Sequence, residues 1–263
     1  MRKKTLLVGG DSWSDQRCSS YRETDIITWP ILLAEKLGMN LVCVAQSGAG
    51  NEQIYSSIFD WICENGTDDI GMVAVGWSKA ERLDYELTYH GKRSYPFEIL
   101  NNTKCTFAGS FWYNTRIAPR GEIHGWIKKS VRNFYNLQLL CEFHNIPYKQ
   151  FQMLSLFTAY LSEYYHETFK EKRIDCINTL NGTAQFDLIN KDNFIGWPIY
   201  DESGGFVIGD ETAHSTFHHR NKLVNNYFRK GKDISMEYVI SNLDAHPNKA
   251  GHKLIMEFIH ENL

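Results

Sequence analysis

A serine that follows an apolar strand at one end of the chain, and an Asp–His pair near the other end, are the residues best suited to chemistry. Ser12 stands in VGGDSWSDQ, and Asp244 and His246 stand in NLDAHPNKAGH. A serine hydroxyl is a weak nucleophile unless a base takes its proton, and a histidine oriented by a carboxylate can serve as that base. The sequence therefore contains the groups for nucleophilic catalysis, provided that the fold brings its two ends together.

The same residues have structural interpretations that need no chemistry. Ser12 can be a turn or cap residue, His246 an ordinary loop histidine, and Asp244 the cap of the last helix. A residue can hold a turn and also react, so these interpretations do not exclude catalysis. The elements that position the residues must decide between them.

Apolar and amphipathic stretches alternate in the first third of the chain and return at its end. Short apolar runs predict buried strands at 5–10, 40–48 and 69–77. Apolar residues at helical spacing predict helices at 29–38, 51–66 and 248–263. Strands that alternate with helices at this spacing are typical of βαβ units and a parallel sheet.

The three predicted strands all end in small or polar residues. GGDSW follows the first strand, QSGAGN the second and GWSKAE the third. Ligands of open α/β sheets bind outside the carboxyl ends of the strands, where backbone N–H groups can approach them closely. Ser12, Gly48, Asn51 and Ser78 are therefore candidate site residues.

Four sequence blocks together resemble those of the SGNH hydrolases, also called the GDSL family. They are GDSW at 10–13, QSGAGN at 46–51, VGWS at 75–78 and DAHPNKAGH at 244–252, and they follow the family's order. The resemblance implies a flavodoxin-like three-layer α/β/α sandwich with a parallel sheet. We expect one such domain over 1–263, with large irregular insertions at about 84–123 and 173–232.

The resemblance also implies roles for individual residues. Ser12 would be the nucleophile, His246 the general base, and Asp244 the carboxylate that orients His246. The backbone N–H groups of Ser12 and Gly48 would form part of the oxyanion hole. Asp11 would hold the turn rather than act on the substrate.

Two positions depart from the family's usual pattern. The third block normally carries an asparagine whose amide completes the oxyanion hole, but this chain has Ser78 there. Asn51, near the head of a predicted helix, is the best substitute donor, and Ser78 is its competitor. Many members also separate the Asp and the His by two residues, whereas only Ala245 separates them here.

The expected function is that of a serine ester hydrolase that works through an acyl-enzyme intermediate and needs no cofactor. The family's members are mostly esterases, lipases, thioesterases and carbohydrate deacetylases, so the expected partner is a small acyl ester or an acetylated carbohydrate. Two alternatives remain open: a binding or assembly module that keeps the fold without strong catalysis, and an acyltransferase that uses the same serine. The sequence does not indicate the oligomeric state.

Composition excludes several other classes of protein. A formal net charge of −3 gives no basic footprint for nucleic acid, and no window approaches the roughly 20 apolar residues of a membrane span. The apolar run after MRKK is too short for a signal peptide, and the six cysteines are scattered. We therefore expect a soluble cytoplasmic protein without disulfides, and no metal site at the cysteines or at His214, His218 and His219.

Overall fold

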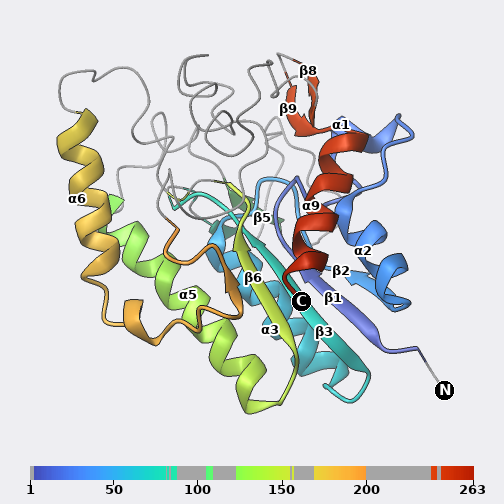
Figure 1. Ribbon diagram of the computed structural model, residues 1–263, viewed down its shortest axis with the longest axis horizontal. Helices are drawn as coiled ribbons and strands as arrows, with labels where there is room; N and C mark the ends of the chain where they lie inside the picture. The colour runs from blue at the N-terminus through green and yellow to red at the C-terminus, as the bar shows by residue number, and fades with distance from the viewer. Residues whose placement is uncertain are drawn as a thin grey trace.

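A five-stranded parallel sheet forms the centre of the chain (Figure 1). Its strands are β1 (Thr5–Gly9), β2 (Asn40–Cys43), β3 (Ile70–Trp77), β6 (Tyr148–Gln152) and β7 (Phe194–Ile195). They lie in the order β2-β1-β3-β6-β7, and every neighbouring pair is parallel. Numbered within the sheet, this is the order 2-1-3-4-5 of flavodoxin-like folds. The predicted fold class is confirmed.

The structure, a computed structural model, describes part of the chain in detail. The described residues are 3–80, 82, 84–87, 105–108, 123–154, 156, 169–199, 238–241 and 244–263. The histidines at 214, 218 and 219 lie outside them, as does most of the two expected insertions. No helix among the described residues is long and apolar enough to span a membrane.

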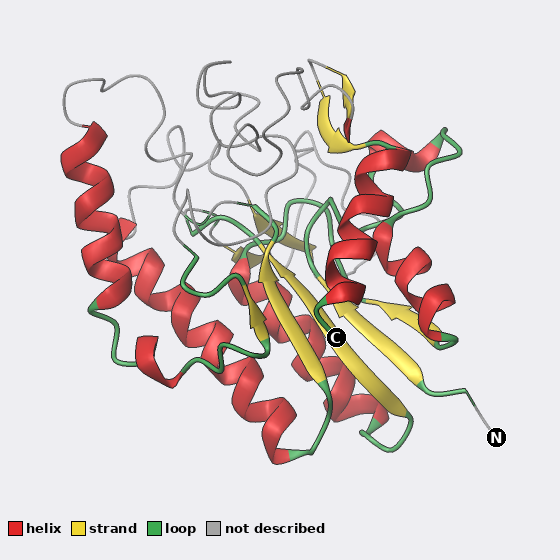
Figure 2. Cartoon of the chain, viewed as in Figure 1, coloured by secondary structure: helices red, strands yellow, loops and turns green. Residues whose placement is uncertain are grey.

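Helices cover both faces of the sheet (Figure 2). They are α1 (Ser19–Arg22), α2 (Trp29–Leu37), α3 (Asn51–Asn65), α5 (Ile123–Phe143), α6 (Phe169–Asn181) and α9 (Lys249–Glu261), with a 3-10 turn η1 (Phe186–Leu188). Two small antiparallel pairs complete the described elements: β4 (Asp84–Leu87) with β5 (Cys105–Ala108), and β8 (Val239–Ser241) with β9 (Asp244–Pro247).

The alternation of side chains along β1 creates the two halves of the core. Leu7 points to the face covered by α3 and α5, where Ile54 and Ile58 of α3 pack against it. Leu6 and Val8 point to the opposite face, covered by α2 and α9. Successive side chains of a strand point to opposite faces, so an apolar run without polar interruptions is what a strand covered on both sides requires.

Two predicted helix ends coincide with the observed ones. Gly38 follows α2 with a φ of 64°, and Gly66 follows α3 with a φ of 75°. Residues with a side chain rarely adopt this left-handed conformation, which explains the glycines at these ends.

The region expected to be irregular at 173–232 contains regular structure where it is described. Most of α6 lies there, and β7 adds the fifth strand of the sheet. Only Phe194 and Ile195 belong to β7, and two residues are too few to produce a periodic signal. The expected insertion at 84–123 likewise contains the antiparallel β4–β5 pair. Each of these strands has four residues, which is too few to show a clear period in the sequence.

Ile58 offers a test of the packing between α3 and the sheet. Its side chain is completely buried against β1, and a Cβ added at Gly9 would collide with it. Replacing Ile58 by Ala should lower the free energy of unfolding by about 2–5 kcal/mol, because the close fit leaves a cavity. Chemical denaturation measures this change. Asp60→Ala, at an exposed site on the same helix, should change it by less than about 0.5 kcal/mol, and equal losses would contradict this assignment.

Candidate active site

The turn that follows β1 presents Ser12 at the carboxyl edge of the sheet. The Asp11 carbonyl accepts the N–H of Ser14 at 2.9 Å, and the Asp11 carboxylate accepts the N–H of Trp13 at 3.1 Å. A Cβ at Gly10 would collide with the Ser14 side chain, so this tight turn requires glycine there. Ser12 keeps 9% of its surface exposed, which leaves a nearly buried hydroxyl at the top of the sheet.

The Asp–His pair lies on β9, directly before α9. Oδ1 of Asp244 lies 2.5 Å from Nδ1 of His246 and also accepts the backbone N–H of His246 at 3.0 Å. A spacing of two positions allows this double contact, so the single intervening residue is compatible with an oriented histidine. Asn248 caps α9 by accepting the N–H of Gly251 at 3.0 Å, and this fixes the start of the helix beside the pair.

The structure brings Ser12, His246 and Asp244 together from opposite ends of the chain. Nε2 of His246 lies 2.9 Å from Oγ of Ser12, while its Nδ1 faces Asp244. If Nδ1 carries the proton that Asp244 accepts, the lone pair of Nε2 faces the Ser12 hydroxyl. This arrangement is the one that a base needs in order to take a proton from serine.

Ser20 also contacts the histidine, but from the other side. Its hydroxyl lies 3.2 Å from Nδ1 of His246 and hydrogen-bonds Asp244. A nucleophile for this base must face Nε2, because Nδ1 is occupied by the carboxylate. Of the two serines, Ser12 is therefore the one placed to react.

The surroundings shift the pKa values of both His246 and Asp244. Burial opposes a charge on His246, but hydrogen bonds and charge interactions with Cys18 and Asp244 outweigh it and raise the pKa of His246. Burial also opposes a charge on Asp244, yet the hydrogen bonds from His246 and Ser20 lower the pKa of Asp244. The pair thus favours an ionised carboxylate beside a basic imidazole.

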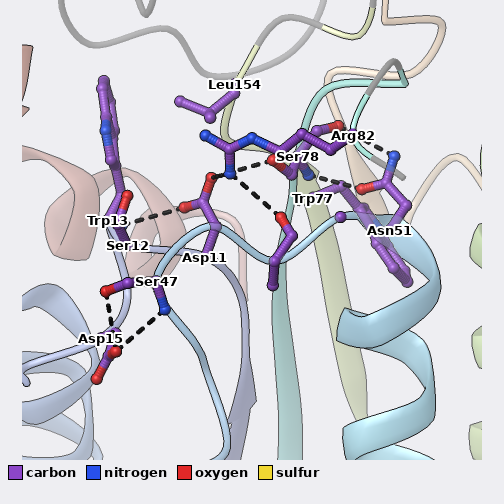
Figure 3. Close-up of polar contacts among 12 residues, drawn as sticks. Asp11, Ser12, Trp13, Asp15, Ser47, Asn51, Trp77, Ser78, Arg82 and Leu154 are labelled. Atoms are coloured by element: carbon purple, nitrogen blue, oxygen red, sulfur yellow. Dashed lines mark hydrogen bonds and ion pairs between the residues drawn. The ribbon is translucent and has the colours of Figure 1, made fainter. Parts of the chain in front are cut away.

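A buried carboxylate ties the ends of three strands together (Figure 3). Asp11 is completely buried and pairs with Nη1 of Arg82 at 2.8 Å. Oγ of Ser78, after β3, donates to the same carboxylate oxygen at 3.1 Å. Arg82 also donates to the carbonyl of Ala49, in the loop after β2, at 3.2 Å. The expectation that Asp11 holds the turn agrees with these contacts.

A second acid fastens the serine turn to the loop after β2. Oδ2 of Asp15 accepts both the N–H and the hydroxyl of Ser47 at 3.1 Å (Figure 3). Its other oxygen accepts Nε of Arg17 at 3.0 Å, and Arg17 donates in turn to the carbonyl of Ala45 at 2.9 Å. These bonds hold the residue before Gly48 against the turn that carries Ser12.

Two backbone N–H groups of these loops belong to Ser12 and Gly48, which the sequence predicts as oxyanion donors. Gly48 has a φ of 85°, a left-handed conformation that favours glycine. Within the described part of the chain, neither the N–H of Ser12 nor that of Gly48 has a hydrogen-bond acceptor. Backbone donors left open beside a nucleophile are what an oxyanion hole requires.

Asn51 and Ser78, the two expected side-chain donors, are engaged elsewhere. The Asn51 amide nitrogen donates to the carbonyl of Ser78 at 3.0 Å and to the hydroxyl of Ser130 at 2.9 Å. Its oxygen accepts the N–H of Ser78 at 2.7 Å. Both amide hydrogens of Asn51 and the single hydroxyl hydrogen of Ser78 are therefore used, the latter by Asp11. A role in the oxyanion hole would require one of these bonds to break.

Several residues at the site carry no sequence signal of their own. Arg82 resembles an ordinary solvated charge in the sequence. Cys18 and Ser47 belong to loops, and Ser20 lies in the four-residue helix α1, which is too short to show a period. Each acquires its place through a partner that is distant in the chain. Among the described residues, no group of three or more His, Cys, Asp or Glu side chains is arranged to hold a metal ion.

No protein-family model and no curated protein matches the sequence. Solved structures that resemble the chain over almost its full length include lipases and esterases. A protein assigned to the G-D-S-L lipolytic family from Desulfitobacterium hafniense DCB-2 is 13% identical, with 99% of both chains covered and a TM-score of 0.44. The psychrotrophic esterase EstA from Pseudoalteromonas sp. is also 13% identical, with 98% of this chain and 96% of that chain covered and a TM-score of 0.43.

A third similar structure is that of a carbohydrate esterase. It is 12% identical, with 98% of this chain and 64% of that chain covered and a TM-score of 0.38. Scores of this size describe a general likeness of architecture. The function is therefore inferred from the site itself.

Replacing Asn51 by Ala should weaken the fold. The change leaves the buried N–H of Ser78 without its acceptor, which should lower the free energy of unfolding by about 1–3 kcal/mol in a denaturant titration. Gln53→Ala, on the same helix and only partly buried, is the control and should cost less. If Asn51→Ala leaves stability unchanged but lowers kcat by about 10²-fold, Asn51 is instead the oxyanion donor expected from the sequence.

Proposed function

We propose that this chain is a serine ester hydrolase of the SGNH type. The observation that carries the proposal is the 2.9 Å contact between Oγ of Ser12 and Nε2 of His246, whose other ring nitrogen faces Asp244. The sequence blocks that resemble the SGNH family include the residues of this contact. The site thus supports a nucleophile, a base and an orienting acid in a single hydrogen-bonded row.

The first half of the reaction transfers an acyl group to Ser12. His246 accepts the hydroxyl proton at Nε2 while Oγ attacks the carbonyl carbon of the ester. Asp244 stabilises the imidazolium that forms and keeps its ring in position. The tetrahedral intermediate then collapses, and His246 returns the proton to the departing alcohol.

The second half releases the acid with water as the nucleophile. His246 takes a proton from water, which attacks the acyl carbon, and then returns the proton to Oγ of Ser12. In both halves the negative charge develops on the former carbonyl oxygen. The open N–H groups of Ser12 and Gly48 supply two donors for it, and no cofactor enters either half.

The substrate class follows from the sequence resemblance. The expected substrate is a small acyl ester or an acetylated carbohydrate, since hydrolases with these blocks act mostly on such esters. The identity of the acyl group and of the alcohol depends on the side chains that line the space above Ser12.

One observation favours the alternative of a binding or assembly module with weak catalysis. Neither Asn51 nor Ser78 presents a free donor, so neither of the two expected side chains supplies a third donor for the oxyanion. Loss of one such donor costs about 10²–10³ in kcat in hydrolases that use it. An acyltransferase would use the same acyl-enzyme and differ only in the group that accepts the acyl chain.

A fluorophosphonate probe should label Ser12. The probe reacts with activated serines, so labelling depends on the same base as hydrolysis. Ser12→Ala should abolish the label, whereas Ser14→Ala, in the same turn but with its hydroxyl toward Trp29, should retain it. Gel fluorescence and peptide mass spectrometry read the result. Absence of the label from correctly folded wild-type protein would favour the binding module.

Activity should decrease as the pH is lowered, and the midpoint of this decrease should lie above the ordinary histidine pKa of about 6.5. His246 must be neutral to act as a base, and its raised pKa moves the loss of activity to higher pH. Asp244→Asn removes one of the two groups that raise the pKa of His246, the other being Cys18, so the acid limb of kcat/KM should move to lower pH. The same change should lower kcat by about 10⁴-fold. An acid limb that stays in place would show that Asp244 does not act on His246.

A further inference from the structure

The base of the site contacts a second nucleophile besides Ser12. Sγ of Cys18 lies 3.7 Å from Nε2 of His246, the same ring nitrogen that lies 2.9 Å from Oγ of Ser12. Cys18 directly precedes α1 and is 5% exposed. Two side chains that can each lose a proton to one nitrogen must compete for it.

Further contacts place the thiol beside the loop that carries the oxyanion donor. Ser47 and the backbone of Ser20 interact with Cys18 and favour a lower pKa of its thiol. Ser47 is the residue before Gly48, and Asp15 holds it against the serine turn. The sulfur thus lies between the base and the same loop that offers its N–H to a substrate carbonyl.

The surroundings of this cysteine differ from those of Cys43 and Cys141. Burial is the main cause that raises the pKa of Cys43 to about 11 and that of Cys141 to about 12. Burial acts on Cys18 too, but the hydrogen bond and the charge of His246 outweigh it, and the pKa of Cys18 is lowered. Cysteines beside a histidine are more reactive for this reason.

We propose that Cys18 is a second nucleophile of the site, which shares His246 with Ser12 and accepts acyl groups from activated esters. The proposal rests on the proposed function, because it uses the same base and the same oxyanion donors. It adds a thioester branch to the serine chemistry.

The step in this branch is balanced without any further reagent. The thiol proton passes to Nε2 of His246, and the sulfur electron pair forms a bond to the carbonyl carbon. The carbon–oxygen bond to the alcohol then breaks, and the leaving oxygen takes the proton from His246. The product is an acyl thioester on Cys18, and water attacking the same carbon regenerates the thiol.

Two titratable groups interact with the thiol. His246 contacts it from β9, and Tyr21 of α1 lies close enough to interact with its charge. Burial raises the pKa of Tyr21 far above its usual value, so Tyr21 stays neutral. Of these groups, His246 is the one that bonds the sulfur directly and can take its proton.

The decisive experiment uses the full-length Ser12→Ala variant with p-nitrophenyl acetate near neutral pH. After an acid quench, peptide mass spectrometry compares acetylation at Cys18 with that at Cys63, an exposed cysteine that serves as the internal control. Exposure alone would make Cys63 the faster site. We expect Cys18 to be acetylated at least about tenfold faster, and the preference to disappear when His246→Asn is added.

A second measurement uses the wild-type chain and so does not depend on the folding of a variant. Iodoacetamide at pH 6 should alkylate Cys18 at least about tenfold faster than Cys63, against the order of exposure. A thiol that this small reagent cannot reach cannot accept an acyl group either. The proposal is wrong if Cys18 reacts no faster than Cys63 in the acetylation measurement, and equally if it reacts no faster in the alkylation measurement.

The failure of this proposal can be told apart from failure of the proposed function. Peptide mass spectrometry of the wild-type chain treated with the fluorophosphonate probe shows whether Ser12 carries the label, separately from Cys18. A labelled Ser12 with an unreactive Cys18 leaves the serine hydrolase and removes the thioester branch. An acetylated Cys18 with an unlabelled Ser12 keeps the second nucleophile and removes the serine mechanism.

Discussion

The fully buried carboxylate of Asp11 is the constraint on which the rest of the site depends. A buried charge is costly unless it is paired and hydrogen-bonded, so the chain must bring cationic and polar groups to it. Arg82, Ser78 and the N–H of Trp13 meet that need, and Arg82 extends the contacts to the loop after β2. The hydrogen bonds and the ion pair that stabilise the Asp11 carboxylate therefore fix the ends of three strands relative to one another.

The same network gives a structural role to Ser78, which stands where the resembling sequence block normally carries an asparagine. In this chain the side chain after β3 is shorter than asparagine and turns toward Asp11, while Asn51 from α3 bonds the backbone on both sides of Ser78. The hydrogen-bonding groups at this strand end thus hold the loops together. The side chains of Asn51 and Ser78 are thereby engaged within the protein.

His246 reaches Ser12 only because the last helix packs beside an early one. The helices α2 and α9 lie side by side over one face of the sheet, with Ile255 and Ile259 of α9 in the same apolar cluster as Trp29 (Figure 1). This packing places β9 above the edge where β1 ends. His252 of α9 accepts the N–H of Trp29 at 3.2 Å, and burial lowers its pKa to about 3, so it serves as a neutral link between the two helices.

The sequence by itself determined the early strands and helices and singled out three candidate residues. Strand and helix periods are local properties, so the early βαβ pattern and the glycine stops at Gly38 and Gly66 could be predicted, and Ser12, Asp244 and His246 stood out by type and position. Only the tertiary structure decided the partners of Asn51, Arg82 and Cys18, as well as the two-residue strand β7. Each depends on segments that are far apart in the chain, and a hydrogen bond between such segments has no period or spacing that a sequence can display.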